Sequence, residues 1–143
     1  MDSVVVRKAR IDELDWINCH YAEIEFVPST EDELIVIAEV NGERAGIGRV
    51  VTINEEVGEL GGIFVLPNFR GQSVAGNIVD TLISEASYPV LYCIPFAHLE
   101  LFYRSHGFDS VKECNLVPEA ILKKVNWCLD QYEEEVRLLV RFT

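Results

Sequence analysis

The spacing of apolar residues along the chain changes between alternation and a repeat of three or four, and this change separates strands from helices. β-branched and other apolar residues dominate residues 34–40 and 45–53, and Asn41-Gly42 between them is the strongest short signal for a β-hairpin. A further apolar run covers residues 58–66 after a short polar turn. These segments predict three sequential antiparallel strands, preceded by a first strand over residues 3–10.

Helical stripes flank these strands. Asp12 is a suitable N-cap for a first helix, whose apolar face consists of Leu14, Ile17, Tyr21 and Ile24. A longer helix is predicted over residues 72–86, where apolar residues recur every four positions at Val74, Ile78, Leu82 and Ala86. Because a short apolar strand over residues 90–94 comes next, we expect a right-handed βαβ unit with parallel ends.

The C-terminal part predicts two more helices and two more strands. An amphipathic helix over residues 97–105 is followed by Gly107, a natural C′ residue. A short strand over residues 110–114, a helix over residues 118–132 and a final strand over residues 136–142 complete the chain. No repeat or linker interrupts this order, which is typical of one α+β unit.

The composition supports a single domain over residues 1–143, a length sufficient for a hydrophobic core. Apolar residues make up 49 % and charged residues 25 %, the balance of an ordinary globular protein. No run approaches the roughly 18 apolar residues of a membrane-spanning helix. Residues 1–8 lack the order of a signal peptide. We therefore expect a cytoplasmic protein that does not associate with membranes.

The formal net charge of −12 argues against nucleic acid as a partner, because binding phosphates requires a basic face. The charge is compatible with a cationic acceptor, and also with an acidic surface that only aids solubility. Since the cysteines form no C-x-x-C pair and the histidines complete no zinc pattern, we predict no metal site and reduced, mostly buried thiols. The cysteines are Cys19, Cys93, Cys114 and Cys128.

The stretch from Phe69 to Gly76 joins the strand at residues 58–66 to the long helix. A glycine-containing turn before a helix leaves several backbone N–H groups unpaired, and the helix dipole adds partial positive charge. Such a turn favours an anion, most often a phosphate. The alternative is that Gly71 and Gly76 serve only the turn and the packing of the helix.

At this turn the chain resembles the GNAT superfamily of acyl-CoA-dependent N-acetyltransferases. Arg70-Gly71-Gln72-Ser73-Val74-Ala75 resembles the family's signature Arg/Gln-x-x-Gly-x-Gly/Ala, and Leu101–Phe108 resembles its segment Phe-Tyr-x-x-x-Gly-Phe. The resemblance covers essentially the whole chain. It implies a three-layer α+β fold with a mixed, mostly antiparallel sheet of about six to seven strands flanked by helices. Many relatives form homodimers, and the sequence leaves that question open.

The resemblance implies acetyl-CoA as co-substrate. The backbone of Ile63, Phe64 and Val65 would line the pantetheine arm, and Arg70 would add a cation near the turn. The pyrophosphate would be held by N–H groups of Gly71, Gln72, Ser73, Val74, Ala75 and Gly76. Ser73 is the main departure, because the family usually has glycine there. We expect Ser73 to lie in the first helical turn without a positive φ, which would leave the site intact.

The resemblance also suggests catalytic residues. Tyr103 aligns with the tyrosine that protonates the departing CoA sulfur, and a phenol with a pKa of ~10 can act as such an acid. A backbone N–H of residues 63–65 would polarise the thioester carbonyl. Glu59 is the candidate base. The alternatives are water without a unique base, or one of Glu39, Glu100 and His98.

Other features are less specific. Cys93 is interpreted as a buried thiol or pocket wall, not as a nucleophile. Pro95-Phe96 stands where relatives often have an asparagine that contacts CoA. The tail of the chain, with its full helix over residues 118–132, resembles that of the N-acetylglutamate synthase branch. Residues 28–33 are the expected acceptor-side loop. We expect an N-acetyltransferase acting on a primary amine; the alternatives are a non-catalytic CoA-binding or regulatory module and an unrelated phosphate-binding fold.

Overall fold

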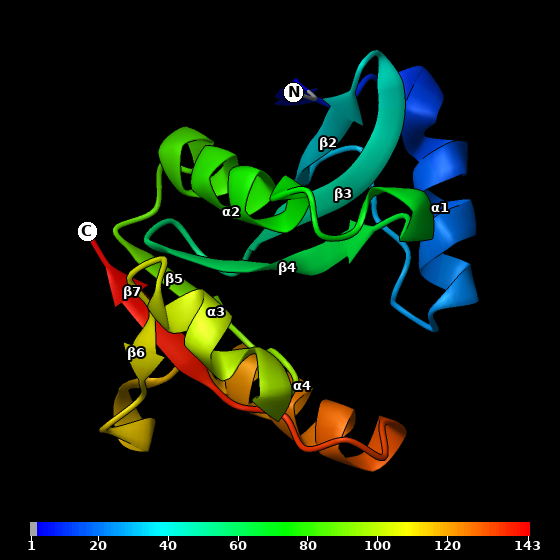
Figure 1. Cartoon of the computed structure of the whole chain (residues 1–143). Helices are drawn as coiled ribbons and strands as arrows, with labels where there is room; N and C mark the ends of the chain where they lie inside the picture. Colours follow the sequence, from blue (N-terminus) through cyan, green and yellow to red (C-terminus); the bar gives the residue numbers. More distant parts are fainter. Residues whose placement is uncertain (1–2) are drawn as a thin grey trace. The chain divides into compact units, whose positions relative to one another are not determined.

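The computed structural model describes residues 3–143, in which seven strands form one mixed sheet in the order β1-β2-β3-β4-β5-β7-β6 (Figure 1). The strands are β1 (Val4–Lys8), β2 (Leu34–Val40), β3 (Glu43–Thr52), β4 (Val57–Val65), β5 (Val90–Cys93), β6 (Asp109–Ser110) and β7 (Leu139–Phe142). The α-helices are α1 (Leu14–Glu23), α2 (Val74–Glu85), α3 (Glu100–Arg104) and α4 (Glu119–Gln131). Short 3-10 turns are η1 (Ile11–Glu13), η2 (Pro67–Phe69), η3 (Ala97–Leu99) and η4 (Cys114–Leu116). The predicted α+β class is confirmed.

The described residues divide into two compact units. The first unit comprises residues 3–51 and 62–86, and the second comprises residues 52–61 and 87–143. The division therefore passes through β3 after Val51, through β4 after Gly61, and through the segment after α2 at Ala86. Residues 1 and 2, which the predicted 1–143 domain includes, lie outside the described range.

In the first unit, β1 and β2 pair antiparallel, as do β2 and β3. The turn between β2 and β3 consists of Asn41 and Gly42, with φ of 51° and 84°. Positive φ at both central residues matches the right-handed twist of the flanking strands, which is why Asn-Gly is so frequent in hairpins. The predicted hairpin is confirmed.

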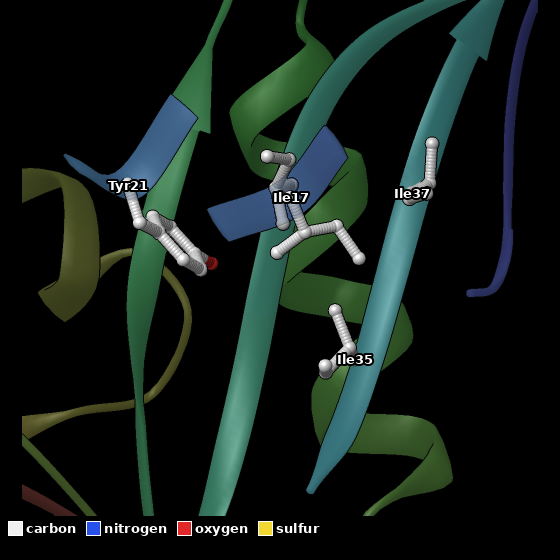
Figure 2. Close-up of a cluster of buried hydrophobic side chains, with 5 residues drawn as sticks. Ile17, Tyr21, Ile35 and Ile37 are labelled. Atoms are coloured by element: carbon white, nitrogen blue, oxygen red, sulfur yellow. The ribbon is translucent and has the colours of Figure 1, made fainter. Parts of the chain in front are cut away.

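Helix α1 packs on one face of β2 and β3 through an apolar cluster. Figure 2 shows Ile17 and Tyr21 of α1 beside Ile35 and Ile37 of β2, and Ile47 of β3 completes the cluster. All five side chains are at most 7 % exposed. Burying a side chain of this size contributes about 1.5–3 kcal/mol, so this cluster fixes α1 against the sheet.

Helix α2 packs closely on β3 at two alternate strand residues, both of which are glycines without a side chain. A Cβ added to Gly48 would lie 2.4 Å from Ile78 Cγ2, and one added to Gly46 would lie 2.9 Å from Ile78 Cδ1. Because successive strand residues point to opposite faces, Gly46 and Gly48 share the face opposite Ile47. Two glycines thus permit α2 to lie directly on the backbone of β3.

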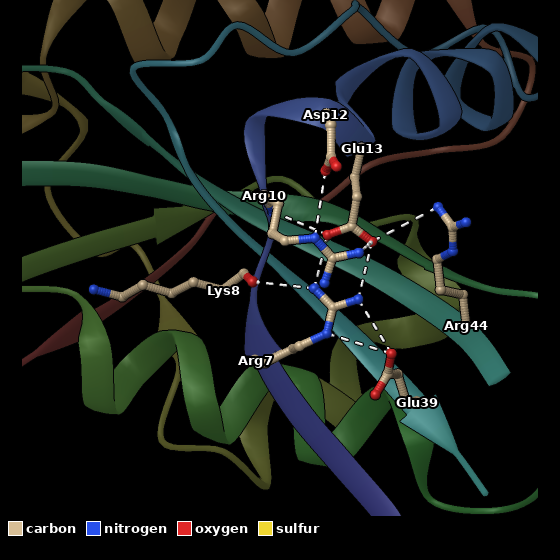
Figure 3. Close-up of polar contacts among 7 residues, drawn as sticks. All are labelled: Arg7, Lys8, Arg10, Asp12, Glu13, Glu39 and Arg44. Carbon is tan, nitrogen blue, oxygen red and sulfur yellow. Dashed lines mark hydrogen bonds and ion pairs between the residues drawn. The ribbon is translucent and has the colours of Figure 1, made fainter. Parts of the chain in front are cut away.

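An ion-pair network joins β1, η1 and β2 (Figure 3). Glu13 is buried, and its Oε1 accepts from Arg7 Nη1 at 2.7 Å and from the Arg10 backbone N–H at 2.9 Å. Arg7 Nη2 also donates to Glu39 Oε2 at 3.1 Å. The N-cap of η1 is Arg10, whose backbone N–H donates to the Glu13 carboxylate, and the N-cap of α1 is Glu13. The prediction that Asp12 is the N-cap was therefore wrong.

In the second unit, β4 and β5 pair parallel with Glu59 opposite Tyr92, as the βαβ prediction requires. Strand β5 then pairs antiparallel with β7, and β7 with β6. Helix α4 packs here through Ile121, which lies in a buried cluster with Val57, Tyr92, Val117 and Val140.

Two expectations for this region are corrected. The strand expected over residues 110–114 is limited to Asp109–Ser110, because residues 114–116 form the turn η4 instead. The final strand is Leu139–Phe142, which is shorter than predicted. Among the cysteines, Cys93 and Cys128 are buried but Cys19 and Cys114 are exposed, so the expectation of mostly buried thiols holds for half of them.

Candidate active-site elements

The turn before α2 differs from the prediction at Ser73. Helix α2 begins at Val74 and not at residue 72, and Ser73 is its N-cap in the left-handed region with φ 63° and ψ 20°. The expectation that Ser73 has no positive φ was therefore wrong. Its carbonyl accepts from the backbone N–H of Asn77 at 3.2 Å and from Asn77 Nδ2 at 2.7 Å. These two hydrogen bonds hold Ser73 in a conformation that costs a non-glycine residue about 1–2 kcal/mol.

The same backbone geometry is of the kind found in anion-binding turns. Gly71 has φ of 80° and Ser73 has φ of 63°, whereas Gln72 between them is not among the residues with positive φ. In proteins, such alternation generally turns successive N–H groups to one side and forms a concavity that suits an anion. The N–H groups of the first turn of α2 extend that site, because the first four N–H groups of a helix have no intrahelical partner.

The side chains of Arg70 and Gln72 in this turn donate hydrogen bonds to nearby backbone carbonyls. Arg70 is exposed, and its Nε donates to the carbonyl of Val65 at 3.3 Å, which ties the cation to the end of β4. Gln72 Nε2 donates to the carbonyl of Asn68 at 3.4 Å, while its Oε1 is buried without a hydrogen-bond partner. Arg70 is therefore held at the end of β4, and its role near a bound cofactor stays a prediction.

The segment Ile63–Val65 forms the end of β4, and all three residues are half-buried. Gly62 precedes it with φ of 62°, and the carbonyl of Gly62 accepts from Tyr21 Oη at 2.7 Å. A positive φ in a strand interrupts the regular pattern and redirects the backbone. The segment expected to line the pantetheine arm thus follows directly after an irregularity in β4.

In the second unit, Tyr103 lies in α3 and is 5 % exposed. Its ring makes edge contacts with Phe102 at 5.0 Å and Phe108 at 6.0 Å between centroids. Burial raises the pKa of Tyr103, with a smaller contribution from Cys93. The phenol therefore stays protonated at neutral pH. Gly107, with φ of 94°, ends this helix as predicted.

Glu59 lies in β4 and is 5 % exposed, and it forms an ion pair with a residue that the sequence analysis missed. Lys124 Nζ of α4 lies 2.6 Å from Glu59 Oε2. The two residues are far apart in the sequence, and a lysine on a helix face normally indicates only solvent exposure. No sequence signal singles out Lys124.

Cys93 lies at the end of β5 and is buried. Burial raises the pKa of its thiol, and the nearby charge of Glu59 raises it further. Since the thiolate is the nucleophilic form, this environment makes Cys93 unreactive, which agrees with its interpretation as a buried thiol.

The alternative bases are all paired as well. Glu39 binds Arg7, and Glu100 Oε2 accepts from Arg104 Nε at 2.7 Å. His98 is exposed, with Nδ1 3.2 Å from Glu134 Oε2. Burial distinguishes Glu59 from these three, since their side chains are between a quarter and two thirds exposed.

Two kinds of feature are absent from the described part of the chain. Within residues 3–143, no three His, Cys, Asp or Glu side chains gather in a group that would hold a metal ion. Over the same residues, no helix combines the length and apolar character required to cross a membrane.

A family model described as "Acetyltransferase (GNAT) domain" matches residues 31–110, more than half of the chain. No curated protein sequence matches the chain.

Three solved structures share the fold. N-acetylglutamate synthase from Neisseria gonorrhoeae, complexed with CoA and N-acetyl-glutamate, is 18 % identical with a TM-score of 0.72 over 98 % of this chain and 35 % of that one. This chain thus spans about a third of that enzyme's length. Rv2747 from Mycobacterium tuberculosis, solved with CoA, is 18 % identical with a TM-score of 0.73 over 97 % and 99 % of the two chains. A GNAT family acetyltransferase from Elizabethkingia anophelis with acetyl-CoA bound is 17 % identical with a TM-score of 0.71 over all of both chains.

Proposed function

Because the chain belongs to the GNAT family of acetyltransferases, we propose that it transfers the acetyl group of acetyl-CoA to a primary amine of a small molecule or protein by direct attack. The observation that supports this most is the turn before α2, where Gly71 and Ser73 both have positive φ. That geometry suits a pyrophosphate, because several N–H groups point to one place at the positive end of a helix.

The proposed contacts with acetyl-CoA come mainly from backbone groups. The N–H groups of residues 71–76 hold the pyrophosphate, and Arg70 adds a charge-assisted contact while its Nε remains tied to Val65. The backbone of Ile63–Val65 lines the pantetheine arm, and one of its N–H groups polarises the thioester carbonyl as negative charge develops on the oxygen.

The proposed role of Tyr103 is to give its proton to the departing CoA thiolate. Its raised pKa keeps the proton in place until the thiolate forms, and burial excludes water as a competing donor. Glu59 is the proposed base that takes a proton from the attacking amine, directly or through water. Lys124, 2.6 Å away, then holds the carboxylate in one orientation.

A second candidate is a non-catalytic CoA-binding or regulatory module. The ion pair between Glu59 and Lys124 favours it, because a carboxylate paired with an ammonium at 2.6 Å also satisfies a purely structural role. Release of free thiol from acetyl-CoA, measured across a panel of amines, separates the two candidates. Binding of CoA without turnover on any amine contradicts the enzyme.

Binding at the turn is tested with a matched pair of variants at Gly71. Asp and Asn both tolerate positive φ, and a Cβ at Gly71 meets nothing within 4 Å, so Gly71→Asp and Gly71→Asn differ mainly in charge. A carboxylate beside a pyrophosphate costs about 1–3 kcal/mol at ~5 Å, so we expect Gly71→Asp to bind CoA at least ~10-fold more weakly than Gly71→Asn. Gly42→Asp, at φ of 84° with equal space, is the control that leaves CoA affinity unchanged. Equal affinity of the Gly71 pair contradicts a pyrophosphate there.

The catalytic role is tested by Tyr103→Phe. Loss of a positioned acid lowers the rate by about 10²–10⁴-fold, so we expect kcat to fall by at least ~100-fold with little change in KM for acetyl-CoA. Tyr88→Phe is the matched control outside the proposed site. An unchanged kcat removes Tyr103 from the mechanism. Cytoplasmic location, homodimer formation and a cationic character of the amine stay predictions from the sequence.

A further inference from the structure

Arg49 of β3 is a buried cation whose capacity to donate hydrogen bonds is only partly used. It is 6 % exposed, and its Nη1 donates to Ser29 Oγ at 2.6 Å. Within residues 3–143 this is the one hydrogen bond recorded for its guanidinium, which has five N–H donors. Removing a charge from water costs several kcal/mol unless charges and hydrogen bonds compensate it. Arg49 therefore retains donors for a further acceptor.

The neighbouring carboxylate does not supply that acceptor. Glu33 Oε1 lies 3.9 Å from Arg49 Nη1, which is beyond hydrogen-bond distance, and Oε1 is buried without any hydrogen-bond partner. A structural ion pair in a protein interior normally closes to hydrogen-bond distance, because only then does the attraction offset the loss of water. The pair is left open although the Arg49 side chain and Glu33 Oε1 are both buried.

The surroundings hold the guanidinium in one place. Its Cζ lies 4.4 Å from the centroid of the Tyr21 ring, a cation–π contact. Ser29 is itself fixed, since its N–H donates to Asn18 Oδ1 at 2.7 Å and its carbonyl accepts from Asn18 Nδ2 at 3.0 Å. A rigid, pre-oriented guanidinium recognises planar acceptors such as carboxylates with little loss of entropy.

The side of Arg49 that carries Nε faces Gly62, just before the proposed pantetheine segment Ile63–Val65. A Cβ on Gly62 would lie 2.9 Å from Arg49 Nε and 2.6 Å from Tyr21 Oη. Because Gly62 lacks a side chain, Arg49 Nε and Tyr21 Oη can both lie against its backbone. The guanidinium therefore lies beside the start of the segment that we propose to present the thioester.

From these observations we infer that Arg49 binds a carboxylate of the acceptor, so that the acceptor is an amine that also carries a carboxylate, such as an amino acid. This inference rests on the proposed function, because it concerns the acceptor of that reaction. It also gives a role to residues 28–33, the expected acceptor-side loop. Ser29 orients the guanidinium through Nη1, and Glu33 lies 3.9 Å from the same nitrogen.

The experiment measures binding without acetyl-CoA, so that it stays separate from catalysis. The probes are amino acids, each paired with its own amide, for example L-leucine with L-leucinamide, assayed by calorimetry and thermal shift. A charge-assisted, bidentate contact is worth about 1.5–3 kcal/mol, so we expect at least one acid to bind about 10–100-fold more tightly than its amide. If no acid is preferred over its amide, the inference is overturned, whether or not the protein transfers acetyl groups.

Variants distinguish recognition of an acceptor carboxylate by Arg49 from a purely structural role of Arg49, in which it only clamps the loop over residues 28–33 to β3. Arg49→Gln is expected to remove the preference for the acid, and Arg49→Lys to retain only part of it, because lysine lacks the bidentate geometry. Glu33→Gln is expected to strengthen the preference at least ~3-fold, since it removes the negative charge that opposes a bound carboxylate. A clamp predicts no gain from Glu33→Gln. A preference that survives in folded Arg49→Gln, or that falls in Glu33→Gln, overturns the inference.

If acids bind as expected but no thiol is released with any amine, the proposed function fails and the carboxylate site remains. If thiol is released with amines that lack a carboxylate, as fast as with the acids, the proposed function stands and the inference is overturned. The two outcomes are therefore distinguishable in the same set of assays.

Discussion

Replacing Ser73 by glycine removes the strain at the start of α2. Ser73 has φ of 63°, where a side chain costs about 1–2 kcal/mol relative to the right-handed region. Glycine adopts this φ without that cost, but it adds about 0.5–1 kcal/mol of entropy to the unfolded chain. The difference predicts that Ser73→Gly raises the free energy of unfolding by about 0.5–1 kcal/mol.

Urea denaturation followed by circular dichroism measures this change, and a gain of about 1 kcal/mol corresponds to a rise in Tm of about 2–4 °C for a chain of this size. The control is Ser105→Gly, because Ser105 has φ of −66° and its Oγ donates to the carbonyl of Phe102. There the same substitution is expected to destabilise the protein by at least ~0.5 kcal/mol. A loss of stability in Ser73→Gly, equal to that in Ser105→Gly, refutes the reasoning.

Three further changes test the packing and the ion pairs. Hydrogen bonding from Arg7 lowers the pKa of Glu13 from 4.5 to about 2, so its stabilisation is fully present above pH 4.5 and is lost as the pH falls towards 2. The difference in unfolding free energy between wild type and Glu13→Gln should therefore shrink by up to about 3 kcal/mol over that window; a constant difference contradicts the shift. Lys124→Met leaves the buried Glu59 carboxylate unpaired and should destabilise by about 2–3 kcal/mol, most of which returns in the double variant with Glu59→Gln; no recovery would mean that the lysine acts elsewhere. Gly48→Ala places a Cβ 2.4 Å from Ile78 Cγ2 and should cost about 1–3 kcal/mol in urea unfolding, and wild-type stability would show that α2 shifts freely.

Local chemistry explains which parts of the fold were predictable. The hairpin at Asn41-Gly42 was correct because two adjacent residues that tolerate positive φ suffice to specify the turn. The strand expected over residues 110–114 was wrong because the extent of an edge strand depends on its partner, and β7 pairs only with Asp109 and Ser110. A pattern of apolar residues contains no information about that limit.

The candidate site was predictable only where one short segment contains it. The turn at residues 71–76 lies within a contiguous motif, but the left-handed φ of Ser73 depends on its hydrogen bonds to Asn77. Arg49 was missed because its burial depends on Tyr21 and Ser29, which lie far away in the sequence. Lys124 was missed for the same reason.

Gly46 contacts both segments that the proposed reaction needs in the first unit. A Cβ there would lie 3.0 Å from the carbonyl oxygen of Phe64 and 3.1 Å from Cγ1 of Val74, the first residue of α2. Because Gly46 has no side chain, the start of α2 and the end of β4 can both lie close to its backbone. A side chain at Gly46 would displace these two segments and so alter the fit of the cofactor that we propose to bind at them.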